Sequence, residues 1–298
     1  MSLLLIILCT SQLMLAQDSS QLYKGYVLNS VLIDDIKKGF DIDKFIKRIQ
    51  DDTTFYKAFK SMSLMSYTQY NDVQFRDKNG ERTSFYNSIS EQTYDGTCRT
   101  MQTKNIKKSK NYFKRKKEPR FITSKFYHKL FLIDKKVCNE NDIVNGKIDA
   151  NENNRINQLK QLIFKPGEPI SGVPGIGNKV GIFKKGRKEQ YDFSLDKEMY
   201  NGEWCYVFRA KPKKKYGKRN VINYLNTWFR AKDYAIVRRN YSLSYSTLVY
   251  DFDVNMKVKL KTIGKKLIPY EVYYKGNWHF FGKKRERAEF SAILTDFR

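Results

Sequence analysis

Apolar and polar positions alternate along the C-terminal part of the chain. Between residues 256 and 262 the alternation is strict, with Met256, Val258 and Leu260 on one side and three lysines on the other. From about residue 182 onward, period-two runs predict strands near 191–200, 204–210, 220–230, 234–250, 252–263, 267–275, 278–281 and 284–297. Because short turns join long strands, we expect an antiparallel meander with one buried face and one wet, cationic face.

Helical patterns come earlier in the chain. Apolar residues recur at helical spacing over 42–49, behind Asp41 as a capping residue. A second short helix is predicted after Asp52, with its apolar face ending near Met62. A further helix is predicted over 125–136, with Ser124 as its cap.

Turn signals organise the segments between these helices. Asn79-Gly80 predicts a tight turn between strands over 63–77 and 81–90, and Asp95-Gly96 predicts the next turn. The Lys-rich segment 104–120 reads as a surface loop or a flexible arm. Another helix is expected near 156–163.

One β-rich domain is the organisation these patterns favour. Its predicted fold class is α+β, with a long antiparallel β-meander forming a curved sheet or half-barrel and a few N-terminal and mid-chain helices. We expect a signal peptide over 1–16 and a single domain over 17–298. The domain would comprise a helical and hairpin part (26–165), a Pro/Gly-rich connector (166–181) and the meander (182–298).

The N-terminus predicts export. Residues 3–15 form an apolar run that ends at Ala16-Gln17, too short to span a bilayer and typical of a signal peptide cleaved after Ala16. The first basic residue is Lys24, so the true start codon stays open. We expect the mature protein in the periplasm or at the periphery of the outer membrane.

Cleavage after Ala16 would leave three cysteines, Cys98, Cys138 and Cys205. An odd number permits one intramolecular disulfide. A Cys98–Cys138 bond would suit an oxidising compartment, and three independent buried thiols are the alternative. The sequence leaves both arrangements open.

Recognisable enzyme chemistry does not emerge from the sequence. It contains no GxSxG, HExxH or CxxC motif, and its two histidines, His128 and His279, have no metal-ligand partner at a suitable spacing. Segment 149–160 resembles a calcium loop, but Lys160 stands where that loop needs a bidentate carboxylate. We therefore expect no catalytic residues, no metal and no cofactor, and a protein that is not an enzyme.

Positive charge is the strongest compositional signal. The chain has 57 Lys and Arg residues against 31 Asp and Glu residues, a formal net charge of +26. Such a field attracts polyanions, and export favours lipopolysaccharide or acidic polysaccharide over nucleic acid. Lysine-rich usage in an AT-rich genome is the alternative explanation. The candidate polyanion-binding residues are Lys107, Lys108, Lys114 and Arg115.

Two hairpins in the C-terminal half resemble a known pattern. The residues that carry it are Tyr191, Phe193, Asn201, Gly202, Tyr206, Phe208, Asp233, Tyr234, Ala235 and Ile236. Their rhythm over about 185–295 resembles exported Bacteroidetes-type proteins of uncharacterised family, and is similar to the half-barrel of periplasmic lipoprotein carriers. The resemblance implies a curved sheet around an apolar cavity and carries over no functional residues.

The leading functional hypothesis is therefore a non-enzymatic envelope protein that binds an apolar or amphipathic ligand, a lipid or a lipoprotein acyl chain, or docks a partner. Outer-face lysines could also hold it at an anionic membrane surface. Polyanion binding is the alternative. The candidate ligand-binding residues, which would form either a core layer or a cavity wall, are Phe193, Trp204, Tyr206 and Phe208.

Overall fold

The computed structural model describes residues 26–115, 117–140, 166–167, 176, 179–248 and 250–298. The predicted signal peptide, the helix expected near 156–163, the segment resembling a calcium loop and most of the Pro/Gly-rich connector lie outside the described residues. Within the described part of the chain, no helix is both long and apolar enough to cross a bilayer.

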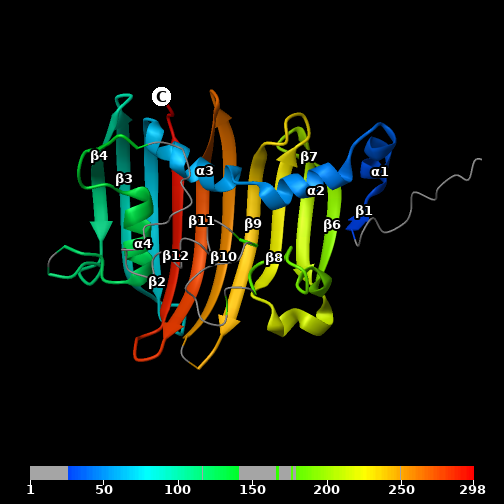
Figure 1. Cartoon of the computed structure of the whole chain (residues 1–298). Helices are drawn as coiled ribbons and strands as arrows, with labels where there is room; N and C mark the ends of the chain where they lie inside the picture. The colour runs from blue at the N-terminus through cyan, green and yellow to red at the C-terminus, as the bar shows by residue number, and fades with distance from the viewer. Residues whose placement is uncertain (1–25, 116, 141–165, 168–175, 177–178, 249) are drawn as a thin grey trace, which may run out of the picture.

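A single sheet dominates the molecule (Figure 1). Its spatial order is β1-β6-β7-β8-β9-β10-β11-β12-β2-β3-β4-β5. The strands are β1 (Tyr26–Leu28), β2 (Tyr67–Arg76), β3 (Arg82–Tyr94), β4 (Cys98–Lys108), β5 (Val137–Cys138), β6 (Tyr191–Tyr200), β7 (Glu203–Pro212), β8 (Ile222–Arg230), β9 (Ile236–Ser246), β10 (Tyr250–Ile263), β11 (Lys266–Phe280) and β12 (Glu286–Thr295).

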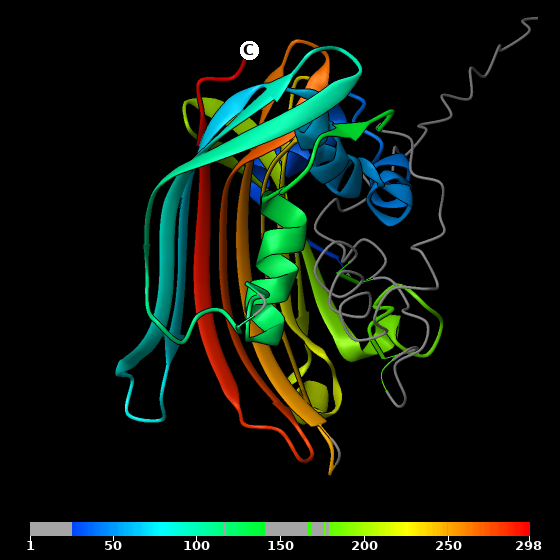
Figure 2. The same cartoon turned by 90° about the vertical axis from the view of Figure 1, so that its left-hand side faces the viewer.

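Consecutive strands β6 to β12 form the predicted antiparallel meander. The N-terminal strands extend it, because β12 pairs with β2 in a register that places Thr295 opposite Thr68. The sheet curves without closing into a barrel (Figure 2). The predicted α+β fold with a curved sheet is therefore confirmed. One edge departs from the meander, since the short strand β1 runs parallel to β6.

The helices lie on the concave side of the sheet (Figures 1 and 2). Asp41 caps α2 as predicted, accepting a hydrogen bond of 3.0 Å from the Lys44 backbone N–H. The apolar face of α2 is buried, because its period of 3.6 turns Phe45 and Ile49 toward the sheet. The helices are α1 (Ser30–Lys37), α2 (Ile42–Asp51), α3 (Thr54–Ser61) and α4 (Ile122–Phe131), with 3-10 turns η1 (Met62–Leu64), η2 (Lys188–Gln190) and η3 (Lys214–Arg219).

Two expectations for the middle of the chain were wrong. Residues 104–108 belong to strand β4 rather than to a loop, because β4 continues its pairing with β3 as far as Lys108. Ser124 does not precede its helix but lies inside the first turn of α4, where its Oγ accepts a hydrogen bond from the Phe121 N–H at 3.1 Å. Within the segment that follows β4, Tyr112 is fully buried.

The concave side of the sheet forms the core. On β10 the predicted alternation is confirmed, since Met256, Val258 and Leu260 are buried while Lys257 is exposed. Under α4 the inner surface of β2 and β3 also contains buried polar residues, with Asn71 bound by the Tyr127 hydroxyl at 2.6 Å. The inner wall is therefore mixed near β2–β3, where Val73, Phe75 and Tyr86 belong to the same core.

Strand β11 passes straight through Gly276, where the sequence predicted a break. The glycine is needed for packing, because a Cβ there would overlap the Tyr274 side chain, whose hydroxyl accepts a hydrogen bond from the Trp278 indole. A residue without a Cβ thus keeps the strand continuous instead of interrupting it.

We expect Gly276→Ala to lower the free energy of unfolding by about 2 kcal/mol, because the added methyl overpacks the buried Tyr274 ring. Chemical denaturation followed by circular dichroism would measure this change. Gly217→Ala is the matched control, since no atom lies within 4 Å of its added Cβ and neither glycine has a positive φ. Equal effects of the two substitutions would contradict this account of Gly276.

Candidate functional site

A hollow of about 940 Å³ lies beside strands β6, β7 and β8. Volumes of about 300–1,000 Å³ are typical of small-molecule sites. Its walls combine apolar or aromatic residues with four cations and two carboxylates. The lining residues are Val27, Lys188, Glu189, Tyr191, Asp192, Phe193, Ser194, Arg209, Ala210, Lys211, Lys213, Tyr224 and Asn226.

The β6–β7 hairpin positions most of this lining. Asn201 and Gly202 both have positive φ values, 48° and 79°, as a two-residue turn of this type requires. The turn fixes a register in which Asp192 lies opposite Lys211. A backbone hydrogen bond of 2.8 Å, from the Lys213 N–H to the Gln190 carbonyl, ties η2 to the end of β7.

Positive charge outweighs negative charge around the hollow. Arg209 forms ion pairs with Asp196 and Glu198, so its charge is partly compensated. Within the described residues, neither Lys211 nor Lys213 has a carboxylate partner at ion-pair distance. An exposed ammonium group without a partner interacts with a bound anion at little desolvation cost. The hollow therefore suits a ligand with an apolar part and a negative charge.

Three of the four predicted ligand-binding aromatics are core residues. Phe193, Tyr206 and Phe208 are buried, and the Phe193 and Phe208 rings lie 5.8 Å apart. Tyr206 packs on Phe40 with ring centroids 4.6 Å apart, and burial raises the pKa of its hydroxyl above the ordinary value. Of the three, Phe193 also lines the hollow.

Trp204, the fourth predicted aromatic, lies at the start of β7 and is 47% exposed. It faces Met199 across the strand pair, and the Lys197 ammonium lies 5.4 Å from its ring centroid. The structure therefore does not bring the four aromatics together as one continuous wall. The sequence pattern could not predict this difference, because strand period identifies a shared face but not which neighbours cover each position.

The four predicted polyanion-binding residues lie together at the far end of β4 and in the turn that follows. Lys107, Lys108, Lys114 and Arg115 are all exposed. The Lys108 ammonium lies 4.7 Å from the centroid of the Phe113 ring. None of the four has an ion-pair partner among the residues that the structure describes. These four exposed cations lie toward the opposite edge of the sheet from the hollow, and their binding of a polyanion stays a prediction.

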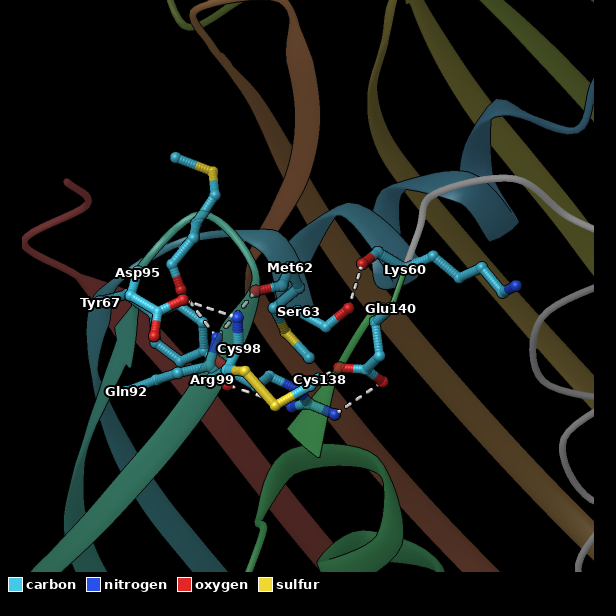
Figure 3. Close-up of polar contacts among 11 residues, drawn as sticks. Lys60, Met62, Ser63, Tyr67, Gln92, Asp95, Cys98, Arg99, Cys138 and Glu140 are labelled. Carbon is cyan, nitrogen blue, oxygen red and sulfur yellow. Dashed lines mark hydrogen bonds and ion pairs between the residues drawn. A yellow bond between two sulfur atoms is a disulfide. The ribbon is translucent and has the colours of Figure 1, made fainter. Parts of the chain in front are cut away.

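The structure joins Cys98 to Cys138 in a disulfide between β4 and β5 (Figure 3). Beside it, Arg99 forms an ion pair with Glu140 and donates a hydrogen bond of 3.1 Å to Gln92 Oε1. Gln92 in turn donates to the backbone carbonyl of Met62 at 3.1 Å. The disulfide thus belongs to a polar network that fixes the end of α3 and η1 to the sheet edge.

Cys205, the remaining described cysteine, is a buried thiol on the surface of the sheet that faces away from the main core. Burial raises its pKa to about 11, so it is a poor nucleophile near neutral pH. It packs with Val207 and Trp228 in a small cluster outside the main core. This environment indicates a packing role.

The two histidines lie in separate environments. His128 lies among aromatic rings, with the Tyr86 centroid 5.2 Å away. His279 lies 3.3 Å from Asp251, but this carboxylate is already held by both terminal nitrogens of Arg285. Among the described residues, no group of three His, Cys, Asp or Glu side chains could hold a metal ion.

The sequence contains a local signal for part of the hollow. Lys211 and Lys213 lie in the Lys-rich run 211–215, and Asn201-Gly202 is a dipeptide typical of a two-residue hairpin turn. Counting the register outward from that turn places Lys211 opposite Asp192. The contributions of η2 and Tyr224, however, depend on tertiary packing.

Comparisons with known proteins return structural likeness at low identity. No protein-family model and no curated relative matches the chain. A DUF1329 family protein from Desulfovibrio piger aligns at 12% identity and a TM-score of 0.27, covering 84% of this chain and 92% of its own. A putative outer membrane lipoprotein-sorting protein domain from Vibrio parahaemolyticus aligns at 10% identity and a TM-score of 0.26, covering 83% and 91%.

A LolA superfamily protein from Nitrosomonas europaea aligns at 9% identity and a TM-score of 0.23, again covering 83% of this chain and 91% of its own. At TM-scores this low the likeness assigns no function, and the functional argument rests on the site itself.

Proposed function

We propose that this chain is a non-enzymatic, exported binding protein that takes an anionic amphipathic ligand, such as a lipid, in the β6–β8 hollow. The observation that carries the proposal is the hollow's mixed lining. Val27 and Tyr224 supply apolar and aromatic surface, while Lys211 and Lys213, which form no ion pair among the described residues, bring positive charge to the same space. The disulfide supports an oxidising compartment.

Ligand displacement tests this proposal. We expect a fluorescent 16-carbon fatty acid to bind the purified protein and to be displaced by palmitate. The double variant Lys211→Glu, Lys213→Glu should weaken this binding by at least about tenfold, because two attractive charges become repulsive. Unchanged affinity in this variant would exclude the hollow as the site.

A second candidate function, polyanion binding, is favoured by the exposed cations at the end of β4. We propose that heparin or lipopolysaccharide binds there, with an affinity that falls steeply as salt rises, because counterions are released from the polyanion. The double variant Lys107→Glu, Lys108→Glu should weaken this binding. Polyanion affinity that does not depend on salt would contradict it.

The two double variants serve as each other's controls. Each changes the net charge of the protein by the same amount, at opposite edges of the sheet. If the hollow binds lipid, Lys211→Glu, Lys213→Glu loses fatty acid binding and Lys107→Glu, Lys108→Glu keeps it. Equal losses in both variants would show that fatty acid binding follows net charge alone, against the hollow.

A further inference from the structure

A second hollow, of about 760 Å³, is lined by residues of η3 and of the strand ends beside the β9–β10 turn. These segments lie at the bottom of Figure 1. The second hollow is distinct from the β6–β8 hollow, with which it shares no lining residue. The side chains that matter to its chemistry are Lys179, Arg187, Arg219, Asn220, Tyr245 and Asp253.

Three cations converge on this hollow. Lys179 donates a hydrogen bond of 3.1 Å to the Tyr245 hydroxyl, and its ammonium lies 4.8 Å from that ring's centroid. Arg187 donates to Gln190 Oε1 at 3.3 Å. Arg219 is exposed and has no ion-pair partner within the described residues. Guanidinium groups in such positions suit a carboxylate or a phosphate, which can accept two parallel hydrogen bonds.

The carboxylates of the hollow do not cancel this charge. Arg285, which is not one of the lining residues, holds Asp251 through both of its terminal nitrogens, at 2.6 and 2.7 Å. Asp253 is exposed and accepts a weak hydrogen bond, of 3.4 Å, from Asn255. The charge of Asp251 is therefore neutralised by Arg285. The Asp253 carboxylate can accept a hydrogen bond from a ligand hydroxyl.

The wall also contains an unpaired acceptor. Asn220 is 4% exposed, and its amide nitrogen donates to the Tyr216 carbonyl at 3.2 Å. Its Oδ1 atom has no donor among the described residues. A buried acceptor without a partner is unusual and needs a donor from water or from a ligand. With Gln190 and Ser246 also on the lining, the hollow can bind several hydroxyl groups.

We propose that this second hollow binds a hydroxylated anion, namely a sugar or polyol that carries a carboxylate or a phosphate. The anionic group pairs with Arg187 and Arg219, and the hydroxyls donate to Asp253 and to the wall at Asn220. The half-buried Tyr245 ring also lines the hollow and supplies apolar surface beside these groups. A free acidic sugar and the polyol-phosphate headgroup of a lipid both have this chemistry.

Calorimetric titration of the full protein tests the site with four soluble probes: glucuronate, glucose 1-phosphate, glucose and inorganic phosphate. Glucuronate and glucose 1-phosphate should bind at least about tenfold tighter than glucose or phosphate, because each supplies both charge and hydroxyls. Failure of both anionic sugars, or equal binding of phosphate alone, would overturn the proposal. Sedimentation with phosphatidylcholine vesicles that contain phosphatidylinositol tests whether the ligand can be a lipid headgroup. Binding to these vesicles would show that the same site also accepts the headgroup.

Variants locate the binding. Arg219→Ala should weaken glucose 1-phosphate binding by about tenfold, and since the side chain is exposed the variant should fold. Asn220→Asp, which is isosteric and adds a negative charge, should weaken it further. Lys257→Ala, an exposed cation on β10 outside the hollow, is the matched control. Equal affinity in Arg219→Ala and in the control would also overturn the proposal.

Discussion

Removal of the Cys98–Cys138 cross-link is expected to lower the free energy of unfolding by about 4 kcal/mol, the largest effect that we predict. The disulfide joins residues 40 positions apart, so it restricts a long loop of the unfolded chain. That loop contains β4, the cationic patch and α4. Denaturation of the double variant Cys98→Ser, Cys138→Ser, followed by circular dichroism, measures the loss.

Reduction provides the control for this experiment. A reductant should destabilise the wild-type protein by a similar amount and leave the double variant unchanged, because Cys205 forms no disulfide. A loss below about 1 kcal/mol would contradict the cross-link's role. Such a result would leave the adjacent Arg99–Glu140 pair and the Gln92 hydrogen bonds as the main support of this edge (Figure 3).

Acidification from pH 6.5 to pH 4 is expected to cost about 3 kcal/mol of stability through His128 alone. Burial among aromatic rings lowers the pKa of His128 to about 4, against 6.5 for an unperturbed histidine. Between these values the unfolded chain binds a proton that the folded chain does not. The stability is therefore complete above pH 6.5 and decreases as the pH falls toward 4.

The variant His128→Phe isolates this contribution. It keeps an aromatic ring beside Tyr86 and Tyr112 and removes the titrating group, whose Nε2 atom is buried without a hydrogen-bond partner among the described residues. Unfolding free energies measured across this pH window should fall less steeply than in the wild type. His279→Phe serves as the control, and a wild-type slope in His128→Phe would refute the assignment.

The regular elements of the fold were predictable because their signals are local. The strict alternation on β10 and the helical spacing behind Asp41 each specify a buried face without reference to the rest of the chain. Strand β1 was missed because three residues carry no measurable period. The strand over 104–108 was predicted as a loop because its lysines obscure any alternation of apolar and polar positions. Its pairing with β3 is what identifies it as a strand.

The sites were less predictable, for a physical reason. The β6–β8 hollow combines side chains from β1, η2, β6, β7 and β8, so only the tertiary arrangement creates it. The aromatics chosen from strand period belong mostly to the core, because period two identifies a shared face and not whether that face is covered. The pairing of Cys98 with Cys138 likewise required the register between β4 and β5.

Native mass spectrometry of the protein purified from the envelope of its own host tests the central claim most directly. If the β6–β8 hollow is a lipid site, the spectrum should show one anionic lipid bound to each chain. That adduct should disappear in Lys211→Glu, Lys213→Glu and persist in Lys107→Glu, Lys108→Glu. A lipid-free protein that also fails to take up fatty acid, or an adduct unaffected by the first variant, would contradict the proposed function.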